Sequence, residues 1–292
     1  MAFRSIFESA TSPVVSFELF PPKTPAGLRT LYRHVERLMA FRPGFVTCTY
    51  GAGGSTQEKT LEIVSQVKQR WQVPVAAHLT CVGANRQALA DFLADADAQR
   101  IDAIVALRGD PPQGSTTFET VPGGLSHANE LVELIRADFP RFGVAVAGYP
   151  EKHVEAPSME VDLEHLKRKV DAGADVVITQ LFYENSDFLR FRDACRRIGI
   201  GVPIVPGLLP IASFSQIQRI TSLCGAKLPQ SLVERLQQAK TEADQASIGT
   251  EHAIAQVEGL LDADVPGIHF YVLNRSEAAS QILRCVEIPT AE

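Results

Sequence analysis

Polar side chains recur where successive β-rich runs of this sequence end. Six runs carry one each, at or just beyond the C-terminal end: Glu18, Thr49, His78, Asp110, Tyr149 and Gln180. Stability alone would favour apolar residues at such positions, because buried strand ends pack best with apolar side chains. Convergence of polar groups on one rim is better explained by a site that binds a ligand and acts on it.

Glu18 is the residue whose chemistry follows most directly from the pattern. Period-two alternation places Phe17 and Leu19 on one face of the first run and Ser16 and Glu18 on the other. The apolar face suits packing against helices, so Glu18 should point into the mouth of the fold. Partial desolvation there is expected to raise its pKa and make it a proton donor near neutral pH. The alternative is a buried carboxylate paired with an arginine.

The segment VALRGDPP offers a second candidate, because Arg108, Gly109 and Asp110 form a turn after a strand. Gly109 permits either a close backbone approach to a ligand or a positive φ, and Asp110 would place a negative charge at the rim. The alternative is an aspartate that only starts a proline turn.

Two further groups could contact a ligand. YPEKH combines an aromatic platform, Tyr149, with a hydrogen-bonding group, His153, although a lone loop histidine more often has no catalytic role. Asp162 and Lys169 lie seven residues apart on one face of a predicted helix, with Arg168 beside them. On their own these charges would indicate a solvated helix face.

Short motifs exclude several chemistries. GAGGST, residues 51–56, follows a strand and opens a helix, but it ends in threonine where the dinucleotide fingerprint has its third glycine. We predict a loop there, with room for an anion contact. Metalloprotease, serine hydrolase, Walker A and EF-hand motifs are absent from the sequence. The five separated cysteines include no C-x-x-C pair, which indicates reduced structural thiols and no metal site.

Charge and hydropathy exclude whole classes of partner. A net charge of -6 and a pI near 5.7 over 292 residues leave no basic stripe for nucleic acid. No run approaches the roughly 20 apolar residues that cross a bilayer, and the first residues lack the apolar centre of a secretory signal. We therefore expect a cytoplasmic protein that binds small molecules, without nucleic-acid or membrane partners.

The elements that must position these residues alternate evenly. We predict eight strands, at 14–20, 44–50, 73–79, 102–107, 143–149, 175–182, 202–206 and 267–273, and an inserted helix within 227–245. Segments between them carry apolar residues at helical spacing, as at Leu61, Val64 and Val67. The alternation predicts an α/β fold, a single (β/α)8 TIM barrel with all strand C-terminal ends on one face. A doubly wound sheet with two added strands is the alternative.

Eight ordered segments resemble the motifs of the methylenetetrahydrofolate reductase family and together span the chain. They are SFELFPPK, FVTCTYGAGGST, AHLTC, VALRGDPP, YPEKHVEAP, DLEHLKRKVDAGADVVITQLFY, PIVPGLLPI and HFYVLNR. The resemblance implies a barrel that binds FAD without a Rossmann motif. It also implies an oxidoreductase that uses NADH or NADPH to reduce 5,10-methylenetetrahydrofolate to 5-methyltetrahydrofolate, in one-carbon metabolism and methionine biosynthesis.

The resemblance assigns roles to single residues. Glu18 is implied to be the general acid that helps open the methylene bridge to a 5-iminium cation, and Asp110 to stabilise that cation beside the flavin. Substrate contacts are implied for Glu18, Gln180, Phe214, Leu273 and Arg275, with Phe214 stacking on folate or nicotinamide. The residues implied to hold FAD are Thr49, His78, Leu107, Arg108, Gly109, Asp110, Tyr149, His153, Asp162, Arg168 and Lys169.

The resemblance also sets expectations for the whole chain. Because the chain ends soon after HFYVLNR, we expect one catalytic domain, residues 1–292, without the C-terminal regulatory domain of eukaryotic members. We expect a homo-oligomer, since barrels often associate. Folate and nicotinamide would use one face of the flavin in turn, which predicts ping-pong kinetics.

Two competing functions differ in class. Proline dehydrogenase also builds a barrel around FAD, but Glu18, Gln180 and Phe214 speak against it. A flavin-free paralogue would bind folate or a partner without catalysis, and retention of Glu18, Asp110 and Lys169 together argues for a working enzyme.

Overall fold

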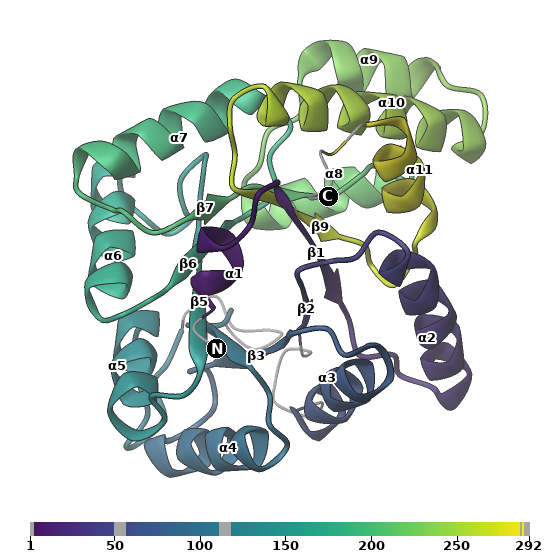
Figure 1. The fold of residues 1–292 in the computed structure, drawn as a ribbon. Coiled ribbons are helices and arrows are strands. Elements are labelled where there is room, and N and C mark those ends of the chain that lie inside the picture. Colours follow the sequence, from purple (N-terminus) through teal and green to yellow (C-terminus); the bar gives the residue numbers. More distant parts are fainter. Residues whose placement is uncertain (1–2, 50–56, 111–117, 287, 289–292) are drawn as a thin grey trace.

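The computed structural model describes residues 3–49, 57–110, 118–286 and 288. Its strands form one parallel sheet in the order β7-β6-β5-β4-β3-β2-β1-β9-β8, which curls into a barrel ringed by helices (Figure 1). The predicted TIM-type barrel is confirmed. The strands are β1 (Val14–Leu19), β2 (Phe45–Cys48), β3 (Val75–Thr80), β4 (Ala103–Leu107), β5 (Gly143–Gly148), β6 (Val176–Thr179), β7 (Ile204–Val205), β8 (Gly207–Leu208) and β9 (Gly267–Tyr271).

Short α1 precedes the first strand, and the other helices lie around the outside of the ring (Figure 1). They are α1 (Ser5–Glu8), α2 (Pro25–Met39), α3 (Gln57–Trp71), α4 (Arg86–Ala98), α5 (Ala128–Asp138), α6 (Met159–Asp171), α7 (Asn185–Arg197), α8 (Phe214–Cys224), α9 (Gln230–Gln238), α10 (Glu242–Leu261) and α11 (Glu277–Cys285). The inserted helix expected before the last strand is α9. Over the described ranges, every helix is too short or too polar to cross a membrane.

The predicted seventh strand, 202–206, forms only at β7, and a further short strand, β8, follows Pro206. β7 pairs with β6, whereas β8, on the other side of the proline, pairs with β9. Proline has no N–H to give to a sheet ladder, and the Pro206 carbonyl accepts a hydrogen bond from the His269 N–H at 2.9 Å. The break lets one segment pair with both neighbours, and this closes the barrel.

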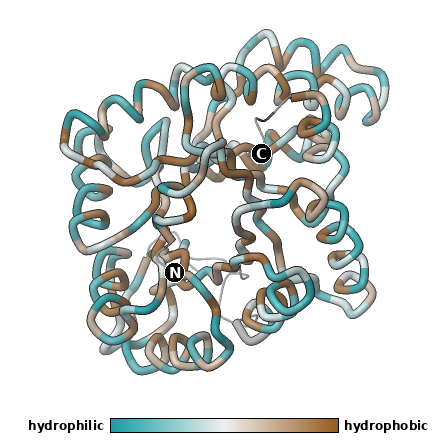
Figure 2. The backbone as a smooth tube through the Cα atoms, in the orientation of Figure 1, coloured by the Kyte–Doolittle hydropathy of each residue, from teal (hydrophilic) through white to brown (hydrophobic). Residues whose placement is uncertain are grey.

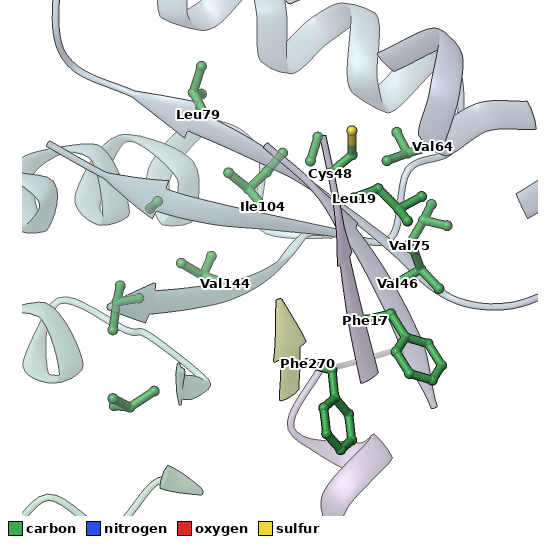
Figure 3. Close-up of a cluster of buried hydrophobic side chains, with 14 of the residues drawn as sticks. Phe17, Leu19, Val46, Cys48, Val64, Val75, Leu79, Ile104, Val144 and Phe270 are labelled. Atoms are coloured by element: carbon green, nitrogen blue, oxygen red, sulfur yellow. The ribbon is translucent and has the colours of Figure 1, made fainter. Parts of the chain in front are cut away.

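The main core lies between the strands and the helices. Phe17 and Leu19 of β1 are buried on this side, together with Val46 of β2 and Val64 of α3 (Figure 3). The helices alternate between hydrophilic and hydrophobic residues along their length, as one buried face requires (Figure 2). The predicted alternation of β1 is confirmed, since Ser16 and Glu18, which alternate with Phe17 and Leu19, face the barrel interior.

A second core fills the base of the barrel. Short α1 lies over the centre of the strand ring in Figure 1, and Phe3, just before it, is only 2% exposed. The Phe3 ring meets the Phe45 ring edge-on, with 4.7 Å between centroids. Small and branched residues such as Ala103 and Val176 complete this layer. The interior is therefore packed at its base, as barrel interiors are.

Side-chain caps fix where several helices begin. The Thr24 hydroxyl accepts a hydrogen bond from the Gly27 N–H at the start of α2, where Pro25 occupies the first turn. Ser158 caps α6 in the same way, by accepting from the Val161 N–H. The cap on α6 matters for the site, because this helix carries Asp162 and Lys169.

Candidate active site

The strand ends open onto a cavity of about 450 Å³ at the C-terminal face of the barrel. All six polar residues that the sequence places at strand ends line it: Glu18, Thr49, His78, Asp110, Tyr149 and Gln180. A second cavity of about 340 Å³ adjoins it, and the two share Leu107, Arg108, Ala147, Tyr149 and His153. We call them the mouth cavity and the side cavity.

Glu18 lies between two buried histidines at the bottom of the mouth cavity. Its Oε2 is 3.2 Å from Nε2 of His78 and 3.7 Å from Nε2 of His269. Burial alone would raise the pKa of Glu18, but the charge of His78 and polar contacts with both histidines outweigh it and lower the pKa to about 2. The sequence-based expectation of a raised pKa is therefore wrong, because it allowed for desolvation and not for these partners. The alternative, an arginine partner for Glu18, is also wrong, because both charged partners are histidines.

The two histidines differ in their surroundings. His269 is 0% exposed, and its Nδ1 is 2.8 Å from the Ser16 hydroxyl. His78 lines the mouth cavity at 6% exposure. Neither of its ring nitrogens meets the geometry of a hydrogen bond to any described residue. The contact between His78 and Glu18 is therefore close and electrostatic.

Sequence reasoning missed His269 and its neighbour Tyr271. Both belong to β9, which pairs with β1 so that Ser16 lies opposite His269 and Glu18 opposite Tyr271. The Tyr271 hydroxyl donates to the Thr179 carbonyl oxygen at 2.6 Å. Burial raises the pKa of Tyr271, with a further contribution from the Glu18 charge, so the phenol is neutral.

The turn after β4 is held by an ion pair and by its glycine. The Arg108 guanidinium donates to both carboxylate oxygens of Glu155, at 2.5 and 2.9 Å. Gly109 has a φ of +89°, and an added Cβ would lie 2.6 Å from a methyl carbon of Val82. Of the two sequence-based explanations for this glycine, the positive φ is confirmed. Asp110 follows it as an exposed carboxylate on the mouth cavity.

Charged groups from α6 line the side cavity. Lys169 Nζ donates to the Ala147 carbonyl oxygen at 2.6 Å and lies 5.9 Å from the centre of the Tyr149 ring. Desolvation lowers the pKa of Lys169 to about 8, against the opposing charge of Asp162. Asp162 is 8% exposed and accepts a hydrogen bond from the His153 N–H at 3.0 Å. Arg168 lines the same cavity.

Not every residue expected at the site lies there. Phe214 does not line either cavity and packs instead in a separate cluster with Leu209 and Ile217. Ile220, further along α8, lines the mouth cavity in its place. Leu273 is 42% exposed and lines the mouth cavity, while Arg275 lines a neighbouring cavity of about 830 Å³ that shares Leu273.

The predicted loop GAGGST, residues 51–56, lies outside the described residues, as do the two prolines after Asp110. The structure therefore gives no test of an anion contact at the first or of a proline turn at the second. All other expected site residues except Phe214 and Arg275 line the mouth cavity, the side cavity or both.

Sequence comparisons relate the chain to one group of proteins. The sequence model of the family described as methylenetetrahydrofolate reductase matches residues 2–287. The 5,10-methylenetetrahydrofolate reductase of Escherichia coli strain K12 is 38% identical over 269 residues, which is 92% of this chain and 88% of that protein. A probable methylenetetrahydrofolate reductase (NADH) of Oryza sativa subsp. japonica is 40% identical over 281 residues. The match covers 92% of this chain but 47% of the rice protein, so the chain spans about half the length of this relative.

A comparison of folds gives a consistent result. An uncharacterized protein from Clostridium thermocellum that binds two copies of 5-methyl-5,6,7,8-tetrahydrofolic acid superimposes with a TM-score of 0.65. The superposition covers 96% of each chain at 14% sequence identity, so this likeness concerns the fold alone.

Proposed function

Because the chain belongs to the methylenetetrahydrofolate reductase family, we propose that it catalyses the reduction of 5,10-methylenetetrahydrofolate to 5-methyltetrahydrofolate. In this proposal FAD is the cofactor and NADH or NADPH is the reductant. The observation that carries it is the mouth cavity, where an acid, a second carboxylate and an amide (Glu18, Asp110 and Gln180) surround one space. Those groups suit a reaction that needs one proton and the stabilisation of one cation.

The residues present fit FAD. The mouth and side cavities adjoin, which suits an elongated ligand, and each has a volume usual for small-molecule sites. Lys169 and Arg168 in the side cavity supply positive charge of the kind that a pyrophosphate needs. Tyr149, between the two cavities, offers a flat neutral ring. When bound, FAD would supply the hydride relay between nicotinamide and folate.

The chain's own groups would orient the folate and handle its charge. Gln180 lies on the mouth cavity, where its amide could pair with the edge of a pterin ring; its Oε1 now accepts from the Leu181 N–H at 3.0 Å. The Asp110 carboxylate would stabilise positive charge on the opened folate. Glu18 would give a proton to the folate nitrogen that leaves the methylene bridge. Ile220 and Leu209 would form apolar walls beside the reacting rings.

One experiment tests the function directly. The purified protein should carry visible flavin absorbance, lose it when NADH or NADPH is added without oxygen, and regain it when methylenetetrahydrofolate follows. The Glu18→Gln variant should keep the first half-reaction and slow the second by at least about a hundredfold, because an amide of equal size cannot donate this proton. Glu258→Gln, at an exposed residue of α10 that lines neither cavity, is the matched control and should keep both half-reactions.

The outcome also separates the competing functions. A colourless protein that takes up no FAD would favour the flavin-free paralogue, and oxidation of proline would favour proline dehydrogenase. If both half-reactions occur, we propose in addition that substrates alternate at one flavin face with ping-pong kinetics. We further propose that the enzyme acts in the cytoplasm, in one-carbon metabolism and methionine supply.

A further inference from the structure

Glu18 has to meet two conflicting demands. A general acid must carry its proton when the substrate is ready, yet the paired histidines lower the pKa of Glu18 to about 2. A carboxyl group whose pKa is lowered below its usual range is ionised at pH 7. The proton that Glu18 donates must therefore be held close by on another group until the substrate is bound.

Geometry favours His78 over His269 as that group. His78 Nε2 is nearer to Glu18 Oε2, at 3.2 Å against 3.7 Å. His78 also lines the mouth cavity, from which a proton can reach it, whereas His269 is fully enclosed and engaged by Ser16. The nitrogens of His78 have no other hydrogen-bond partner in the described ranges of the chain.

We propose that His78 is the proton store of Glu18, a positioning residue that acts through this carboxyl group and not only a contact for the cofactor. The inference rests on the proposed function. In the open site the pair is imidazolium and carboxylate. When ligands fill the cavity, the proton moves from His78 Nε2 to Glu18 Oε2, so that the pair becomes neutral imidazole and carboxylic acid. Glu18 then gives this proton to the folate nitrogen, and His78 takes a new proton from water when the site reopens. One proton is consumed per turnover, because opening the methylene bridge to a cation requires protonation of the nitrogen that leaves.

The driving force is the loss of water from the mouth cavity. In a low-dielectric site, an imidazolium and a carboxylate 3.2 Å apart have a higher free energy than the neutral imidazole and carboxylic acid that form when the proton moves. The residues that line the mouth cavity together with His78 include Thr49 after β2, the apolar Val105 and Leu107 on β4, Tyr271 on β9 and the rim carboxylate of Asp110. His269 is the competing imidazole, and it is enclosed and lies farther from Glu18.

The test compares pH profiles of the two half-reactions from about pH 6 to pH 9. In the wild-type protein the folate half-reaction should reach a plateau at low pH, where the pair holds its proton. In His78→Gln it should be slower by about a hundredfold at pH 7 and keep rising about tenfold per pH unit as pH falls, because Glu18 must be protonated directly. Flavin reduction by NADH needs no proton from Glu18, so it should lose far less than the folate half-reaction and keep its wild-type pH profile. His269→Gln is the matched control and should keep the plateau.

Three results decide the matter. A plateau that persists in His78→Gln overturns the proton store. So does an equal loss of FAD binding and of both half-reactions, which would make His78 a flavin contact only. A wild-type protein without flavin or without the folate half-reaction would instead refute the proposed function itself.

A second measurement does not depend on a folded variant at position 78. Infrared difference spectra of the wild-type holoenzyme with and without folic acid should show a protonated carboxyl band that appears on binding. The band should be missing from Glu18→Gln. If folic acid binds and no such band appears, the proton does not move to Glu18 and the inference is wrong.

Discussion

At the scale of single residues, the charge of Lys169 should change with pH just above neutrality. Its pKa is lowered to about 8 by desolvation, so it loses its proton more easily than an exposed lysine. An anionic ligand in the side cavity would favour the charged form and raise the pKa again. The direction of the pH dependence follows from this: FAD binding takes up protons, so the affinity for FAD should weaken as pH rises above about 8.

This dependence can be measured by titrating the FAD-free protein with FAD between pH 7 and pH 9 and following flavin fluorescence. Affinity should fall several-fold over this range in the wild-type protein. Lys169→Met should bind more weakly at pH 7 and lose most of the dependence. An unchanged slope in the variant would mean that another group titrates, and Lys167→Met on the outer side of α6 is the matched control.

The sequence predicted positions of site residues better than their charge states. Alternation along one strand sufficed to direct Glu18 into the barrel, because side-chain direction is a local property. Its pKa depends on His78 and His269, which come from strands far away in the sequence. The same alternation applied to GIHFY would have directed His269 and Tyr271 inward, so these two could have been found.

At the scale of elements, α1 and the residue before it close the base of the barrel. Phe3 fills the space beside Phe45, and Gly143 leaves room for it, since an added Cβ there would lie 2.2 Å from the Phe3 Cβ. We predict that Phe3→Ala lowers the free energy of unfolding by about 3 to 5 kcal/mol, because a full aromatic ring is lost from a packed core. Phe7→Ala, at a partly buried ring, should cost clearly less.

Urea denaturation of the two variants measures this difference. Below the unfolding transition, both variants should keep the mouth cavity unchanged, because it lies at the opposite end of the barrel. Equal losses of stability, or none for Phe3→Ala, would show that α1 does not anchor the base. The sequence could not predict this role, because one helical turn has too few residues to show which face it buries.

The strand predictions held where apolar runs were long and departed where a proline intervened. All eight predicted runs contain strand residues, but in the seventh only Ile204 and Val205 form a strand, and β8 begins beyond its predicted end at Pro206. Which neighbour each half pairs with depends on barrel closure, and closure is a property of the whole sheet. The substrate contact of Phe214 stays a prediction, and the structure adds Ile220 of α8 as a residue that lines the cavity.

At the scale of the whole molecule, the barrel is closed by its weakest pairing. Each half of the seventh strand contributes two residues to the sheet, whereas β3 contributes six. Opening free energy should therefore be lowest around this segment. In hydrogen exchange, the amides of Val205 and Leu208 should exchange faster than those of Ala77 and Leu79 in β3. Equal protection at both places would indicate that the barrel opens only as one unit.

The packed base also governs how substrates share the enzyme under the proposed function. Over the described residues, Phe3 and Phe45 fill the base of the barrel, so under the proposed function both substrates would enter and leave at the opposite face, where the mouth cavity opens. An excess of either folate or nicotinamide would then occupy the mouth cavity and inhibit binding of the other substrate. The turnover rate would then depend on the ratio of the folate and nicotinamide concentrations, that is, on the ratio of one-carbon units to reductant.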